Sequence, residues 1–164
     1  MIFEVTTNSE EETVLLGKMM SVLFKEGDVL ALDGDLGAGK THFTTGFAEG
    51  LSCTGHVSSP TFTIVNEYKG PKFNLYHFDT YRLSGVDDFY DSGLDEYFDY
   101  GGICIIEWSK IISEALPENT VKGEILGVGD ERRLTFDFDE KFFDLNEVKK
   151  VMDSFIATIK GGNS

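Results

Sequence analysis

The sequence is poor in basic residues. Its 164 residues contain 14 Lys and Arg against 29 Asp and Glu, which gives a formal net charge of −15. Direct nucleic-acid binding depends on clustered Lys and Arg side chains, because these neutralise the backbone phosphates. The charge balance therefore argues against a protein that binds nucleic acid by itself, and it suits either solubility or docking on a basic partner.

Cysteine is scarce, and long apolar runs are absent. Cys53 and Cys104 have neither CxxC spacing nor a metal-ligand pattern, so reduced thiols are favoured over a single disulfide. Residues 1–12 lack the basic and apolar regions of a secretory signal, and no apolar run approaches the length of a membrane span. We therefore expect a soluble, cytoplasmic protein with no membrane contact.

Apolar residues are nevertheless sufficient for one packed domain, at 41% of the sequence, with 13% aromatics. Strand-like runs alternate with helical patterns, and two pairs of adjacent strands interrupt the alternation. This arrangement predicts a single α/β domain over residues 1–164, with three layers and a mixed sheet that includes two hairpins. We expect the tail after about residue 160 to be disordered.

The expected elements follow from apolar spacing and turn residues. Ser9 and Glu12 match a capping box at the start of the first helix. Strands are expected at residues 2–5, 29–32, 62–68, 73–79 and 102–108, and in a hairpin over 120–138. Helices are expected at about residues 10–24, 40–50, 109–115 and 145–159, with short helical pieces over 86–100.

A phosphate-binding motif lies between the second strand and the second helix. GDLGAGKT, residues 34–41, fits the pattern G-x-x-x-x-G-K-[ST]. In such a loop, backbone N–H groups and the start of the helix surround phosphates, because both carry partial positive charge. Lys40 would reach the β- and γ-phosphates and Thr41 would ligate Mg²⁺. The motif thus predicts a nucleotide site in a P-loop NTPase fold.

Two carboxylates end apolar strand-like runs, where open α/β sheets place ligands. Glu107 follows the run 103–106, and Asp79 follows the run 73–78. One acid would hold Mg²⁺ directly or through water, and the other would orient the attacking water. The sequence does not assign the two roles. The alternatives are a solvated strand end for Glu107 and a helix or turn cap for Asp79.

Two further residues are candidates by position. Thr61 lies in SSPTFT, residues 58–63, where its hydroxyl could approach the γ-phosphate as part of a switch; a simple turn into a strand is the alternative. Trp108 is the single tryptophan and follows Glu107. Without further context, its position indicates an aromatic residue of the core or of the core's edge. The guanine-reading N-K-x-D motif of GTPases is absent from the sequence, so ATP is favoured over GTP.

Four segments in this order resemble one family: GDLGAGKT (34–41), SPTFTIVNEY (59–68), YHFDTYRL (76–83) and IEW (106–108). This set is similar to the TsaE family, formerly YjeE, the small P-loop ATPase of bacterial tRNA threonylcarbamoyladenosine (t6A) biosynthesis. The resemblance implies binding of ATP or ADP with Mg²⁺ on Thr41 and Glu107. The nucleotide contacts that it implies are Glu10, Gly37, Ala38, Gly39, Lys40, Thr41, His42 and Arg132 or Arg133. The activity-linked positions that it implies are Lys40, Thr61, Asp79, Glu107 and Trp108.

The resemblance also implies partners. The family acts with a TsaB–TsaD heterodimer, which modifies adenosine 37 of tRNA with an intermediate that TsaC supplies. Hydrolysis of ATP by the small ATPase would reset that complex between turnovers, and tRNA would be met only indirectly. We expect slow hydrolysis by the isolated chain and stimulation by partners, because nothing obvious supplies an arginine finger in cis.

Two other functions stay open from the residues alone. A small-molecule kinase would use the same phosphate loop, but the chain has only Arg82, Arg132 and Arg133 to build a lid over a phosphate acceptor. A nucleotide-sensing binding module would instead dock through the acidic and aromatic segment 87–100, because aromatics are enriched at interfaces.

Overall fold

A mixed β-sheet forms the frame of the fold in the computed structural model, which describes residues 1–35 and 37–162. Its strands are β1 (Ile2–Thr7), β2 (Val29–Gly34), β3 (Val65–Tyr68), β4 (Leu75–Asp79), β5 (Ile103–Glu107), β6 (Val121–Val128) and β7 (Glu131–Asp137). These seven strands of the described chain follow the order β1-β7-β6-β2-β5-β4-β3. β2 pairs in parallel with β5 and β6, and β4 pairs in parallel with β5; the other three pairs are antiparallel. The predicted mixed sheet is confirmed.

The helices of the described residues flank this sheet. They are α1 (Glu10–Met20), α2 (Lys40–Gly50), α3 (Val86–Asp91) and α4 (Leu145–Gly162), with 3₁₀ segments η1 (Ser21–Leu23), η2 (Leu94–Asp99) and η3 (Ser109–Ala115). Ser9 caps α1 as predicted, since its Oγ accepts the Glu12 N–H at 3.1 Å; Glu12 Oε1 accepts the N–H of Asn8, one residue before the cap, at 3.1 Å, in place of the Ser9 N–H of a standard capping box. The sequence signal for this helix start is therefore confirmed.

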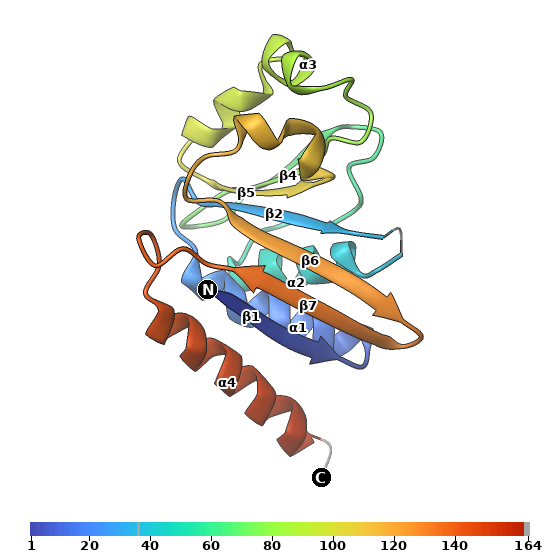
Figure 1. The fold of residues 1–164 in the computed structure, drawn as a ribbon, viewed down its shortest axis with the longest axis vertical. Helices are drawn as coiled ribbons and strands as arrows, with labels where there is room; N and C mark the ends of the chain where they lie inside the picture. The colour runs from blue at the N-terminus through green and yellow to red at the C-terminus, as the bar shows by residue number, and fades with distance from the viewer. Residues whose placement is uncertain (36, 163–164) are drawn as a thin grey trace.

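The sheet and the helices that pack on its two faces form the three layers. α1 and α2 lie on one face of the sheet, with α4 beside α1 (Figure 1). They bury most of the large aromatic core there, including Phe43, Phe47 and Phe155. On the other face, α3, η2 and η3 cover β4, β5 and part of β2 around Phe78 and Phe89. This second cover does not extend over β1, β7 and β6, where Ile2 and Leu126 are 67% and 42% exposed.

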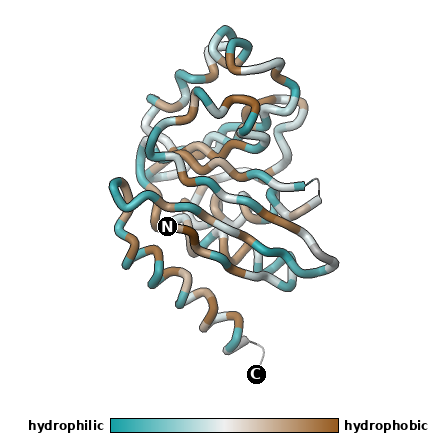
Figure 2. The backbone as a smooth tube through the Cα atoms, in the orientation of Figure 1, coloured by the Kyte–Doolittle hydropathy of each residue, from teal (hydrophilic) through white to brown (hydrophobic). Residues whose placement is uncertain are grey.

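Strand composition explains which strands lie in the centre. Every residue of β4 and β5 is buried, as are the first four of β2, and all three strands are rich in apolar residues. Such runs suit strands that are covered on both faces. The outer strand β1 instead alternates toward its end, which suits one covered face. Figure 2 shows hydrophobic residues along the central strands and alternating hydropathy along α4.

Element boundaries differ modestly from expectation. Both predicted hairpins are present, as β3–β4 and β6–β7. β1 extends to Thr7 because its pairing with β7 continues to Arg132. The helix expected to reach residue 24 becomes α1 followed by η1, and the helix expected at 109–115 is the 3₁₀ segment η3. α4 continues to Gly162; the expected disorder beyond about residue 160 stays a prediction, since residues 163–164 lie outside the described part.

Two further sequence expectations concern thiols and membranes. Cys53 and Cys104 are both free, as favoured. Burial raises the pKa of the Cys104 thiol to about 12. None of the helices in the described part of the chain has the length and apolarity that crossing a membrane requires.

Candidate nucleotide and magnesium site

The loop between β2 and α2 carries the phosphate-binding motif. It leaves the sheet at Gly34, where any side chain is excluded because a Cβ would lie 2.4 Å from the Ile125 carbonyl oxygen. Gly39 directly precedes α2 with φ of 103°, in the left-handed region that favours glycine. Among the described residues no side chain caps α2, so its first N–H groups can serve an anion. Leu36, within this motif, lies outside the described residues.

Lys40 folds back over this loop and is only 7% exposed. Its Nζ donates a hydrogen bond to the Gly34 carbonyl oxygen at 2.7 Å and lies 3.7 Å from Glu107 Oε1. The same ammonium lies 5.0 Å from the centre of the Trp108 ring, within cation–π range. The motif lysine therefore links the phosphate loop to the last residue of β5 and to the residue after it.

Two carboxylates lie at the ends of neighbouring parallel strands. Asp79 ends β4 and Glu107 ends β5, and the two residues are register partners, each 4% exposed. The alternative of a solvated strand end is wrong for Glu107, because its side chain is buried and paired. Asp79 does cap a turn, since Oδ1 accepts the Tyr81 N–H at 2.9 Å, but its Oδ2 also accepts from Thr61 Oγ1 at 3.2 Å.

The segment before β3 brings Thr61 to Asp79. A turn forms here, in which the Ile64 N–H donates to the Pro60 carbonyl oxygen at 2.8 Å. Within it the hydroxyls of Ser59 and Thr61 lie 2.8 Å apart. The simple turn is thus present, and it also carries the Thr61 hydroxyl to the carboxylates. The switch role of Thr61 stays a prediction.

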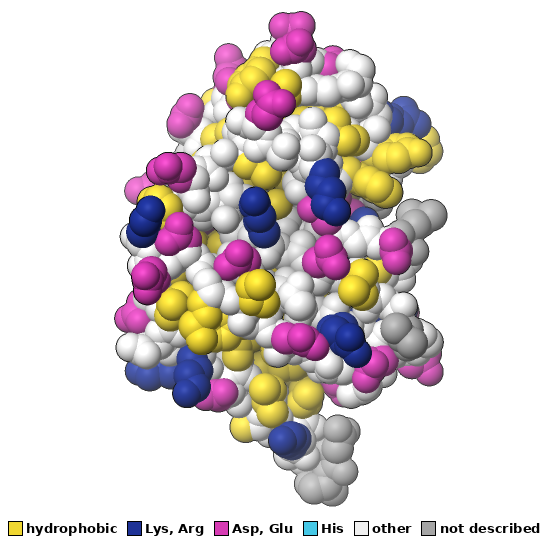
Figure 3. All heavy atoms as spheres, in the orientation of Figure 1, with side chains coloured by type: hydrophobic (Ala, Val, Ile, Leu, Met, Phe, Trp, Pro, Cys, Tyr) yellow, Lys and Arg dark blue, Asp and Glu magenta, His cyan; other side chains and the backbone are white. Residues whose placement is uncertain are grey.

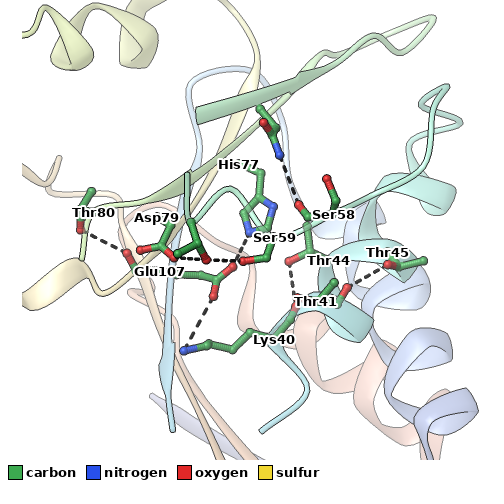
Figure 4. A network of polar contacts seen from close by, with 12 residues as sticks. Lys40, Thr41, Thr44, Thr45, Ser58, Ser59, His77, Asp79, Thr80 and Glu107 are labelled. Carbon is green, nitrogen blue, oxygen red and sulfur yellow. Dashed lines mark hydrogen bonds and ion pairs between the residues drawn. The ribbon is translucent and has the colours of Figure 1, made fainter. Parts of the chain in front are cut away.

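A pocket of about 510 Å³ lies between these groups. It is lined by Gly37, Gly39, Lys40, Thr41, His42, Ser59, Thr61, Asp79, Tyr81, Glu107 and Trp108. Figure 4 shows Lys40, Asp79 and Glu107 directed toward one another from the helix start and the two strand ends. Residues that are far apart in the sequence thus meet at the carboxyl edge of the parallel strands, where ligands bind in open α/β sheets.

Backbone contacts that sequence reasoning missed hold Trp108 in place. Trp108 has φ of 58° and ψ of 38°, a strained conformation for a bulky residue. The next residue, Ser109, donates its N–H and Oγ–H to the Asp33 carboxylate at 2.8 and 2.6 Å. Thr80 Oγ1 donates to the Trp108 carbonyl oxygen at 2.8 Å, and the ring packs on Tyr81. No sequence pattern signals this anchoring, because Asp33 and Ser109 are 76 positions apart.

A second pocket, of about 390 Å³, lies on the other side of the phosphate loop. Glu10, His42 and Arg132 line it together with Gly37 and Gly39. Glu10 Oε2 lies 3.6 Å from His42 Nε2. Arg133 instead lies beside Glu4 at 3.4 Å, on the opposite face of the sheet from Arg132, because adjacent strand residues point to opposite sides. Of the two candidate arginines, only Arg132 lines this pocket.

The donor set suits Mg²⁺ better than a softer metal. Thr41 supplies a hydroxyl and Glu107 and Asp79 supply carboxylates around one pocket. Mg²⁺ prefers such oxygen ligands and completes its shell with waters and substrate phosphates, so few protein ligands suffice. Thr41 and Glu107, the ligands that the family resemblance implies, both line this pocket, and their role as ligands stays a prediction.

Comparisons with known proteins identify the family. A family model described as "Threonylcarbamoyl adenosine biosynthesis protein TsaE" matches residues 7–134, from the end of β1 into β7. The chain belongs to the TsaE family. The tRNA threonylcarbamoyladenosine biosynthesis protein TsaE of Bacillus subtilis is 50% identical over 131 residues, which are 79% of this chain and 82% of that protein. The protein of the same name from Treponema pallidum is 39% identical over 127 residues, which are 77% of this chain and 93% of that protein.

A solved structure supports the same assignment. The crystal structure of Bacillus subtilis YdiB superposes with a TM-score of 0.74 at 39% identity. The match covers 92% of this chain and 94% of that one. With the phosphate loop between β2 and α2, the single-domain P-loop NTPase fold expected from the sequence is confirmed.

Proposed function

We propose that this chain is an Mg²⁺-dependent ATPase that serves tRNA t6A biosynthesis. The pathway follows from the family, since relatives that are 50% and 39% identical carry the name of that biosynthesis. The observation that carries the ATPase activity is the single pocket in which Lys40, Asp79 and Glu107 meet beside the phosphate loop. A P-loop enzyme needs these elements: a lysine for the phosphates and carboxylates for the metal and the attacking water.

The phosphates would bind to the loop and the start of α2. N–H groups of residues 37–42 would surround the β-phosphate, with the partial positive charge of the helix start behind them. Lys40 would exchange its bond to the Gly34 carbonyl oxygen for the β- and γ-phosphates. Because Lys40 is nearly buried, its charge would act on the phosphates with little screening by water.

Asp79 and Glu107 would divide the remaining work. Glu107 lies next to the Lys40 ammonium and shares its pocket with Thr41, so we assign Glu107 and Thr41 to Mg²⁺. Asp79 already accepts from the Thr61 hydroxyl, and together they would orient the attacking water. The chemistry that Mg²⁺ would supply when held there is positive charge that offsets the charge developing on the phosphates. Trp108 would close one wall of the pocket.

The pocket of about 390 Å³ next to the loop would take the nucleoside. It is contiguous with the phosphate loop through Gly37, Gly39 and His42, which line both pockets. Glu10 at the start of α1 and Arg132 on β7 would both contact the nucleotide. ATP is preferred over GTP because the guanine-reading N-K-x-D motif is missing from the sequence.

Partners would complete the activity in the cytoplasm. No arginine lines the pocket of about 510 Å³ within the described residues, which supports slow hydrolysis without a partner. A TsaB–TsaD heterodimer would stimulate hydrolysis and be reset by it. The net charge of −15 supports contact with tRNA only through that complex. On the face drawn in Figure 3, Lys and Arg side chains lie singly or in small groups among Asp and Glu.

The direct test is phosphate release from ATP by the purified chain, with Mg²⁺, then TsaB–TsaD, then tRNA added in turn. We expect slow release with Mg²⁺ alone and faster release with the heterodimer. A phosphorylated small molecule detected by mass spectrometry would favour the kinase alternative instead. If the chain neither binds nor hydrolyses ATP under any of these conditions, the proposal is wrong.

A further inference from the structure

A buried histidine contacts Glu107 from the side opposite Lys40. His77 lies on β4 with no exposed surface, on the same face of the sheet as Asp79. Its Nε2 lies 2.5 Å from Glu107 Oε2, whereas Glu107 Oε1 lies 3.7 Å from Lys40 Nζ. Figure 4 shows the Glu107 carboxylate between these two side chains. Each carboxylate oxygen therefore has its own partner.

The hydrogen-bond inventory fixes which nitrogen of His77 carries the proton. An ammonium such as that of Lys40 can only donate hydrogen bonds, and the carboxylate paired with it can only accept them. Nε2 must therefore be the donor. His77 Nδ1 has no hydrogen-bond partner among the described residues. A second proton there would bury an N–H without an acceptor, so the neutral Nε2–H tautomer fits best.

A buried ring nitrogen without a hydrogen-bond partner costs folding free energy. The presence of His77 at this position therefore calls for an explanation, which its other ring nitrogen supplies. We propose that His77 is a positioning residue, which holds Glu107 Oε2 by its Nε2–H and so directs Oε1 toward Lys40, the phosphates and Mg²⁺. This inference rests on the proposed function. Glu107 would otherwise rotate about its side-chain bonds, and its oxygen would meet the metal in the correct place less often. Partners of metal-ligating side chains commonly change metal affinity by about 10- to 100-fold.

The test compares His77→Leu with His77→Gln. Leucine removes the donor, whereas the glutamine amide can reach the same oxygen and donate. Binding of fluorescently labelled ATP is measured as Mg²⁺ is titrated. We expect His77→Leu to raise the half-saturating Mg²⁺ concentration about 10- to 100-fold, with labelled ATP binding without Mg²⁺ changed less than about threefold, and His77→Gln to restore most of the loss.

Two controls separate positioning from stability. Ile105, the register partner of His77 on β5, is buried without contacting the pocket, so Ile105→Val should lower the melting temperature and leave the Mg²⁺ titration unchanged. His56→Leu removes an exposed imidazole and should change neither the melting temperature nor the Mg²⁺ titration. If Ile105→Val shifts the titration as far as His77→Leu, the effect is one of stability and the positioning role is wrong.

A spectroscopic measurement needs neither nucleotide nor metal. The ¹⁵N shifts of the His77 ring should report the neutral Nε2–H tautomer in the wild-type chain, and Glu107→Gln should shift the Nε2–H signal. An Nδ1–H tautomer would overturn the inference. If wild-type nucleotide binding is itself independent of Mg²⁺, the proposed function fails. If it depends on Mg²⁺ but His77→Leu titrates like wild type, only the role of His77 fails.

Discussion

A glycine contact between α1 and α2 sets the position of the phosphate loop, because α2 begins at Lys40. Gly46 of α2 approaches α1 so closely that a Cβ would lie 1.8 Å from the Val14 carbonyl oxygen and 3.0 Å from the Lys18 nitrogen. Both atoms belong to the backbone, so no side-chain rotation can relieve the clash. Gly46→Ala must therefore separate the two helices.

The magnitude follows from two opposing terms. Overpacking a core costs about 1–3 kcal/mol, and a clash with backbone belongs at the upper end, near 3 kcal/mol. Alanine is favoured over glycine within a helix by about 1 kcal/mol. The net loss of unfolding free energy is then about 2 kcal/mol, and the melting temperature falls by roughly 4–8 °C for a chain of this size.

Thermal unfolding followed by circular dichroism measures this loss. The matched control is Gly161→Ala in α4, where an added Cβ would meet nothing within 4 Å. This control should leave the melting temperature unchanged or raise it slightly. A Gly46→Ala chain that is as stable as wild type would refute the close packing of α1 on α2, and with it this account of how the loop is placed.

Three further predictions follow from the site and the core. Lys40→Ala should raise the Kd for ATP by roughly 100-fold in calorimetric titration, because about 3 kcal/mol of charge-assisted hydrogen bonding is lost; unchanged affinity would contradict the site. Arg132→Ala should weaken ATP binding by about tenfold, whereas Arg133→Ala, which removes only the partner of Glu4, should change it by less than about twofold. Equal effects would contradict the assignment of the pocket. Since burial raises the pKa of Cys104 from 9.0 to about 12, the stability that its protonated thiol contributes is present below pH 9.0 and lost as pH rises toward 12. The free energy of unfolding, measured in urea at increasing pH, should fall less for Cys104→Ala than for wild type. Identical pH dependence of the two chains would contradict this.

Much of the fold could be predicted from local patterns. The buried runs in β2, β4 and β5 are apolar enough to be read as central strands, and turn residues mark both hairpins. Boundaries depend on tertiary contacts that local patterns do not contain. β1 continues to Thr7 because β7 offers a partner there, and the helix after Trp108 is 3₁₀ in a segment anchored on Asp33.

Some residues of the candidate site could also be predicted from the sequence, and others could not. The phosphate motif and the two strand-end acids could be found from sequence, because residue type and position along a strand carry their chemistry. The sequence could not show which of Arg132 and Arg133 lines the pocket of about 390 Å³, since strand register decides it. His77 gives no sequence signal as a partner of Glu107, because a histidine in a buried strand also fits ordinary packing.

The most direct measurement of the central claim is the number of t6A modifications per TsaB–TsaD heterodimer, with TsaC, tRNA, ATP and Mg²⁺ supplied. With the wild-type chain, ATP-driven resetting predicts many modifications per heterodimer. With Lys40→Ala, the count should stay near one. Equal counts for the two chains would contradict the claim that ATP bound at this phosphate loop resets the complex.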